Sequence, residues 1–142
     1  MIVQCQRIHP NAKLPTYAHP GDAGMDVHCL DAFELLPGDR KRIPTGLQIA
    51  IPNGYEGQIR PKSGLAARHG VTVLNAPGTI DSGFRGELEV VLINHSRKIV
   101  AFDAHAKIAQ LVIAPVMRVD IQAVETLADT TRGQGGFGST GD

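Results

Sequence analysis

Turn-forming residues recur at short intervals along much of this 142-residue chain, and this recurrence constrains the fold more than any other feature. Glycine and proline dominate these turns, with 16 and 9 residues in the whole chain. The turn signals lie at 19–22, 37–39, 44–46, 52–54, 76–78 and 81–83. Short apolar or alternating runs lie at 47–51, 55–59, 71–74, 87–93, 108–116 and 119–124. This rhythm predicts a many-stranded β-sandwich or jelly roll.

One segment, 63–69, has the pattern of a helix. Ser63 is the expected N-cap, leucine and alanine follow it, and Gly70 ends it. Hydrophobic residues make up 42% of the chain and charged residues 20%, which is typical of a globular protein. Because only 4% of the residues are aromatic, we expect an aliphatic core in a single all-β domain with one short helix.

The C-terminal segment differs in composition from the rest. Residues 132–141 contain five glycines in ten positions, too few apolar side chains to offset the entropy lost on ordering. We therefore expect a β-domain over residues 1–128 and a flexible arm over residues 129–142.

The charge balance and the termini exclude several classes of protein. Fourteen basic and fourteen acidic residues give a net charge of zero, which argues against direct nucleic-acid binding through bulk charge. No run approaches the roughly 18 apolar residues of a membrane span, and the N-terminus lacks the apolar stretch of a signal peptide. We expect a cytoplasmic protein without membrane association, in which Cys5 and Cys29 stay reduced. The cysteine and histidine spacings match no common zinc motif.

Residues 60–66 connect a predicted strand to the predicted helix and form a candidate anion site. Lys62 supplies a charge, Ser63 a hydroxyl donor, and Gly64 allows a ligand to approach the backbone. The alternative interpretation is an ordinary capped helix with a surface lysine.

Residues 75–86 form a second candidate site, between two predicted strands. A hairpin there would expose the carboxylate of Asp81, which can accept a proton from water. Phe84 could offer a flat face to a ring, and the amide of Asn75 could contact the edge of a base. Alternatively, Asp81 belongs to a common Asp-Ser-Gly turn and Asn75 closes a loop.

Two acidic residues and one glutamine are weaker candidates. Asp22 and Asp26 lie in a glycine-rich entry to a strand, where they could position a metal or water or could serve turn chemistry. Gln110 is the polar residue of an otherwise apolar strand, and it either needs partners inside the protein or faces outward.

The glycine-rich arm has the residues of a lid over a nucleotide. Arg132 suits a phosphate, Phe137 suits stacking on a base, and Ser139 and Thr140 offer hydroxyls. The segment does not match the phosphate loop of NTPases, because Ser139 stands where that motif requires lysine. The alternative is a disordered tail.

Five stretches resemble, in order, the five sequence motifs of the trimeric dUTP diphosphatases (dUTPases). They are residues 18–27, 61–66, 75–86, 107–111 and 132–140. The resemblance implies a β jelly roll assembled as a homotrimer, with the arm of one subunit closing a site formed by its neighbours. It also implies hydrolysis of dUTP to dUMP and pyrophosphate, with Mg²⁺ bound mainly through the substrate phosphates. That reaction limits uracil incorporation into DNA and supplies dUMP for thymidylate synthesis.

The resemblance also assigns roles to individual residues. Asp81 matches the catalytic aspartate that activates water for attack on the α-phosphorus, and Phe84 matches the aromatic residue that packs on deoxyribose. The hairpin residues that read uracil match Asn75, Gly78, Thr79 and Ile80, together with the backbone of Asp81. The phosphate-binding residues match Lys62, Ser63 and Gly64. Asp26 and Gln110 match residues that act on the metal through water. The lid matches Arg132, Phe137, Ser139 and Thr140.

Three positions depart from the family pattern. The family usually has arginine at Lys62 and Lys107, and lysine offers phosphate a point charge instead of a bidentate fork. It usually has tyrosine at Phe84, which lacks the hydroxyl.

Two other functions compete with this interpretation. One is a deoxycytidine triphosphate deaminase of related fold, whose catalytic glutamate would lie near residues 90–92, where this chain has only Val-Val-Leu. The other is a non-catalytic jelly-roll module that uses a nucleotide site for regulation.

Overall fold

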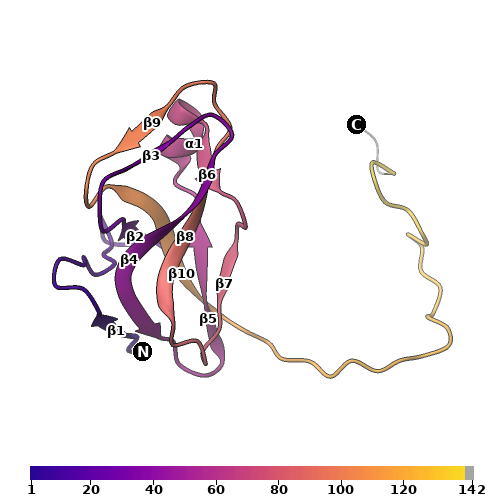
Figure 1. The fold of residues 1–142 in the computed structure, drawn as a ribbon. Coiled ribbons are helices and arrows are strands. Elements are labelled where there is room, and N and C mark those ends of the chain that lie inside the picture. Colours follow the sequence, from indigo (N-terminus) through magenta and orange to yellow (C-terminus); the bar gives the residue numbers. More distant parts are fainter. Residues whose placement is uncertain (140–142) are drawn as a thin grey trace.

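The structure, a computed structural model, describes residues 1–139 of the chain. Its elements are short strands and one helix, as Figure 1 shows. In chain order they are β1 (Gln4–Arg7), β2 (Met25–His28), β3 (Phe33–Leu35), β4 (Arg40–Ala50), β5 (Tyr55–Arg60), α1 (Ser63–His69), β6 (Val71–Val73), β7 (Gly78–Ile80), β8 (Glu87–Asn94), β9 (Val100–Phe102) and β10 (Lys107–Pro115). The predicted all-β class with one short helix is confirmed, and the arrangement fits a jelly roll.

Antiparallel strands form two four-stranded sheets and a two-stranded ribbon. One sheet has the order β1-β4-β8-β6, the other has the order β2-β10-β5-β7, and β3 pairs with β9. Along β8 every second residue is buried, the alternation expected of a strand that covers a core with one face. In the second sheet β7 is an edge strand, so one side of its backbone has no neighbouring strand within the sheet.

The core between the sheets is aliphatic, as the composition predicts. Its fully buried side chains include Leu35, Leu47, Val90, Leu92 and Leu111. Aromatic residues contribute mainly at one end, where the rings of Phe33 and Phe102 stack with their centroids 4.6 Å apart. Burial of this aliphatic surface is the main favourable term that holds the sheets together.

Helix α1 forms where the sequence predicts it, but its N-terminus differs by one residue. Lys62, not Ser63, occupies the N-cap position, because its carbonyl accepts the backbone N–H groups of Leu65 and Ala66, both at 3.1 Å. No side chain caps this end, so the predicted capping role of Ser63 is wrong. Gly70 ends the helix at φ 64°, the left-handed conformation that glycine adopts readily.

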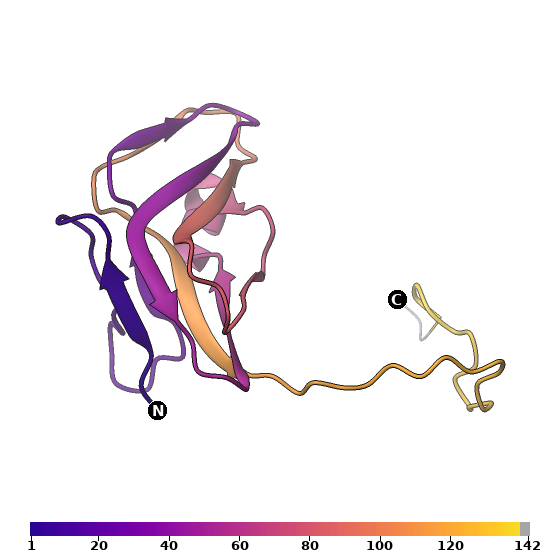
Figure 2. The same ribbon diagram turned by 60° about the horizontal axis from the view of Figure 1, so that its bottom comes forward.

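The C-terminal segment leaves the body directly after β10. Figures 1 and 2 show it running away from the sheets as an extended chain. The strand predicted at 119–124 does not form, and Val119 and Ile121 are 68% and 91% exposed. Within residues 1–139 the segment pairs with no strand, and an unpaired strand leaves its backbone to water. The flexibility of the arm over 129–142 stays a prediction.

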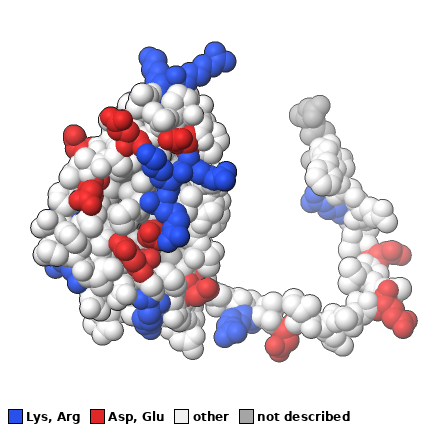
Figure 3. All heavy atoms as spheres, in the orientation of Figure 1, with Lys and Arg blue, Asp and Glu red and all other residues white. Residues whose placement is uncertain are grey.

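Two surface properties complete the description. On the face shown in Figure 3, acidic and basic side chains lie side by side. Within residues 1–139, no helix is both long and apolar enough to cross a bilayer.

Candidate active site

The hairpin around β7 lines a cavity of about 340 Å³. The hairpin residues that the sequence predicts for contacts with the base, the sugar and the attacking water meet there: Asn75, Gly78, Thr79, Ile80, Asp81 and Phe84. The opposite wall comes from β4 and β8, with Arg42, Glu87, Leu88, Glu89 and Val91. The structure thus places one exposed carboxylate, one amide and one aromatic ring around a single hollow.

Glycine lets the amide of Asn75 lie against the start of β7. A Cβ added at Gly78 would lie 3.2 Å from Asn75 Nδ2 and 3.4 Å from the Cβ of Ile59. Gly78 is opposite Ile59 in the register of β5 and β7, so a side chain there would press on both neighbours. The Asn75 amide is therefore held close to the exposed edge of β7.

A tight turn carries Asp81 and Phe84 into the cavity. The N–H of Phe84 donates to the carbonyl of Asp81 at 3.0 Å. Arg85 reinforces the turn, because its Nη1 donates to the carbonyls of Ser82 at 2.8 Å and Phe84 at 2.6 Å. Asp81 is exposed and Phe84 half-exposed, so both are accessible to a ligand.

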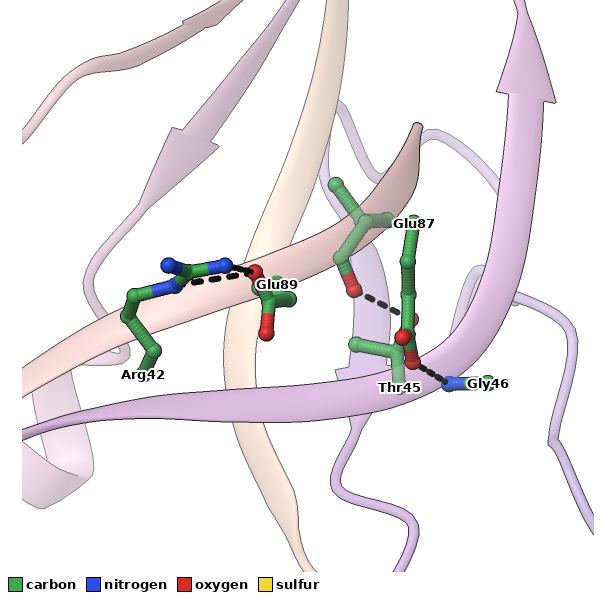
Figure 4. Close-up of polar contacts among 6 residues, drawn as sticks. Arg42, Thr45, Gly46, Glu87 and Glu89 are labelled. Atoms are coloured by element: carbon green, nitrogen blue, oxygen red, sulfur yellow. Dashed lines mark hydrogen bonds and ion pairs between the residues drawn. The ribbon is translucent and has the colours of Figure 1, made fainter. Parts of the chain in front are cut away.

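The far wall contains two glutamates that sequence reasoning missed. Figure 4 shows that Glu89 is paired with Arg42 and that Glu87 accepts the N–H of Gly46, the latter at 2.8 Å. The alternation along β8 was the available signal, since it places residues 87, 89 and 91 on one face. The alternation could not show that this face borders the cavity, because that contact depends on how β7 of one sheet is placed relative to β8 of the other.

A second cluster centres on a buried carboxylate. Asp26 is only 6% exposed at its side chain, and its two oxygens contact Lys62 Nζ at 2.5 Å and Lys107 Nζ at 2.7 Å. Burial by itself would raise the pKa of Asp26, but the two ammonium groups outweigh it and keep that pKa below its ordinary value. The two lysines that stand where the family usually has arginine thus contact the same carboxylate. Two ammonium groups and one carboxylate leave this cluster with a net positive charge.

The remaining residues of this second cluster lie around the same strands. Gln110 is opposite Asp26 in the β2–β10 register and is half-buried, with its side chain against Gly24. Gly64 lies under the guanidinium of Arg68, whose Nη2 would be 2.9 Å from an added Cβ. Asp22 is explained by turn chemistry, because its Oδ2 accepts the N–H of His19 at 2.8 Å.

Within residues 1–139, the two clusters and the arm do not form one site. Lys62, Ser63 and Gly64 are absent from the residues that line the cavity of Asp81. Arg132 donates from Nε to the carbonyl of Gly135 at 3.0 Å, and Phe137 is fully exposed. Both belong to the segment that extends away from the sheets (Figure 2). Ser139 is also exposed, and Thr140 lies outside the described residues.

Comparison with known proteins decides between the competing functions. The family model for dUTPase matches residues 10–141. This chain belongs to the dUTPase family. It is 54% identical over 132 residues to the deoxyuridine 5'-triphosphate nucleotidohydrolase of Anaeromyxobacter sp., covering 93% of this chain and 90% of the relative. It is 49% identical over 141 residues to the enzyme of the same name from Gloeothece citriformis, covering 99% and 97%.

Solved dUTPase structures have the same fold. A dUTPase mutant of Staphylococcus bacteriophage 80alpha, solved with dUpNHpp, superposes with a TM-score of 0.92 at 25% identity over 99% of each chain. A mutant dUTPase of phage phi11 of S. aureus, whose structure shows the coordination of a structural Mg(II) ion, gives a TM-score of 0.83 at 23% identity, covering 91% of this chain and all of the phage chain. As a dUTPase, this chain is a hydrolase, a dUTP diphosphatase, and the deaminase interpretation is set aside.

Proposed function

We propose that Asp81 is the general base of dUTP hydrolysis, and that it activates a water molecule for attack on the α-phosphorus to release dUMP and pyrophosphate. One observation carries this proposal: the exposed carboxylate of Asp81 shares a single cavity with the amide of Asn75 and the ring of Phe84. A carboxylate so placed can take a proton from water beside a bound nucleotide.

The free edge of β7 supports recognition of uracil. β7 pairs with β5 on one side only, and it is the last strand of its sheet. Backbone N–H and C=O groups on the other side are available to a ligand, as they are on any open sheet edge. In our proposal these groups, over Gly78 to Asp81, and the amide of Asn75 pair with the edge of the base. Phe84 packs on the deoxyribose.

The second cluster suits the triphosphate. Lys62, Ser63 and Gly64 bind phosphate oxygens in this proposal, and Asp26 holds the ammonium groups of Lys62 and Lys107 in place. Because two lysines share one carboxylate, the cluster keeps an excess positive charge for an anionic substrate. The arm residues Arg132, Phe137, Ser139 and Thr140 complete the site as a lid.

Magnesium fits this site as an ion carried mainly by the substrate. Among residues 1–139, no group of three or more His, Cys, Asp or Glu side chains could hold a metal. Asp26 already contacts two lysines, so it and Gln110 suit contact through water better than direct coordination. Mg²⁺ commonly keeps several waters and binds through substrate phosphates. When bound, it would neutralise phosphate charge.

The proposal includes a homotrimer in the cytoplasm. The segment after β10 exposes Met117, Val119, Ile121 and Leu127, apolar surface that another subunit can cover. Neighbouring subunits would also unite the two clusters and the arm, which one chain keeps apart. Both cysteines are free thiols, as expected in a reducing compartment.

The test is turnover and binding by Asp81→Asn. We expect pyrophosphate release from dUTP to fall by about 10³-fold or more, with dUTP affinity changed less than about threefold, because the amide cannot accept the proton. Asp31→Asn, at an exposed position outside the cavity, is the matched control. Near-normal turnover by Asp81→Asn would reject the proposal.

A further inference from the structure

Gly86 lies directly under the ring of Phe84. A Cβ added at Gly86 would come within 2.7 Å of Phe84 Cζ and 2.9 Å of Cε2, closer than carbon atoms can approach without a shift. The ring therefore occupies space that any other residue at position 86 would take. Gly86 is not in the left-handed backbone region, so it is the contact with the ring, and not the backbone conformation, that favours glycine there.

The backbone of Phe84 cannot easily move to relieve such a contact. Its N–H is bonded to Asp81, and its carbonyl accepts from Arg85, which also bonds to Ser82. The ring, in contrast, is 42% exposed and can rotate. A Cβ at position 86 would thus displace the ring while leaving the turn and the carboxylate of Asp81 in place.

We propose that Gly86 is a positioning residue for sugar selectivity, which it controls by seating the Phe84 ring in the cavity. This inference rests on the proposed function, in which that ring packs on the deoxyribose. A ring held against the backbone of Gly86 has one defined position and can block the space of a 2′-hydroxyl. A displaced ring no longer blocks that space, so discrimination between dUTP and UTP falls.

The experiment compares kcat/KM for dUTP and UTP in Gly86→Ala. We expect the ratio of the two values to fall at least about tenfold, within the range by which one steric contact discriminates substrates. Thermal unfolding is measured alongside, and the midpoint is expected to stay close to that of the unchanged protein. Gly83→Ala is the matched control, because a Cβ at Gly83 would meet nothing within 4 Å. In Gly83→Ala the ratio of kcat/KM for dUTP to that for UTP should not change.

A double substitution separates positioning from a general structural effect. If Gly86 acts through the ring, Gly86→Ala should have no further effect on the ratio once Phe84→Ala has removed the ring. The inference would be overturned, and the proposed function would stand, if the ratio of kcat/KM for dUTP to that for UTP did not change in Gly86→Ala. The same holds if Gly86→Ala lowered that ratio equally with and without the Phe84 ring. Failure of the unchanged protein to hydrolyse dUTP would instead overturn the proposed function and this inference with it.

Discussion

At the scale of single residues, the most strongly constrained side chain is Asp26. It is buried, and both of its oxygens contact lysine ammonium groups. A buried carboxylate is tolerated only when it is paired, and removing its charge leaves the partners without compensation. Lys62 and Lys107 are 23% and 51% exposed at their side chains, so each can turn partly toward water.

Asp26→Asn should therefore lower the free energy of unfolding by about 2 kcal/mol at pH 7, less than the loss of a fully buried pair. The folded state holds the pKa of Asp26 below its ordinary value, so its contribution is complete above the unfolded pKa and is lost as the pH falls through the folded pKa. The difference between the two proteins should shrink below about pH 4. Urea denaturation at several pH values measures it, with Asp31→Asn as control. A difference that stayed constant down to pH 2 would contradict this account.

The sequence predicted correctly which side chains meet where those side chains belong to a single hairpin. Asn75, Asp81 and Phe84 are near one another in the chain, so a hairpin necessarily brings them together. The pairing of Asp26 with Lys62 and Lys107 joins three separate motifs, and neither spacing nor composition shows that those side chains touch. Glu87 and Glu89 were missed for the same reason.

At the scale of elements, the irregularity in β4 shapes the wall of the cavity. The register between β4 and β8 shifts between Pro44 and Gln48. Two bonds hold this region, as Figure 4 shows: Thr45 Oγ1 donates to the carbonyl of Leu88 at 2.6 Å, and Gly46 N–H donates to Glu87. At this irregularity, these two hydrogen bonds take the place of the regular backbone hydrogen bonds between β4 and β8.

Thr45→Val should destabilise the protein by about 1–2 kcal/mol, because it keeps the shape of a buried side chain but leaves the Leu88 carbonyl without its donor. Thermal or urea unfolding measures the loss. Thr72→Val, at a half-buried position on β6, is the matched control and should change stability by less than about 0.5 kcal/mol. An equal effect of both substitutions would show that the Thr45 bond contributes nothing specific.

The sequence predicted elements well where turns and alternation act locally. β5, α1 and β8 form within a residue or two of their predicted bounds. The segment 119–124 has equally good strand composition but pairs with no strand in the described part of the chain. Strand formation there depends on a partner, which no local pattern reveals.

At the scale of the whole molecule, the account requires a site built from more than one chain. The cavity of Asp81, the cluster of Asp26 and the arm lie in separate parts of the described chain. In an assembly of identical subunits, a residue from one copy can complete the site of another. Mixed assemblies of two inactive variants can test this directly.

Co-expression of Asp81→Asn with a variant that ends at Thr131 should restore activity that neither variant shows alone. A mixed site can combine an intact Asp81 from one subunit with an intact arm from another. Each trimer that contains both variants then has one complete site of its three, about one third of the full activity per subunit. Pyrophosphate release from the co-purified, differently tagged complex measures it. Mixed complexes without activity would show that the arm serves the site of its own chain.

Hydrolysis of dUTP in water enriched in ¹⁸O tests the central chemical claim most directly, because mass spectrometry of the two products shows which phosphorus received the water oxygen. Attack on the α-phosphorus by water activated at Asp81 predicts that the label appears in dUMP and not in pyrophosphate. Label in pyrophosphate, or cleavage to dUDP and phosphate, would contradict the account.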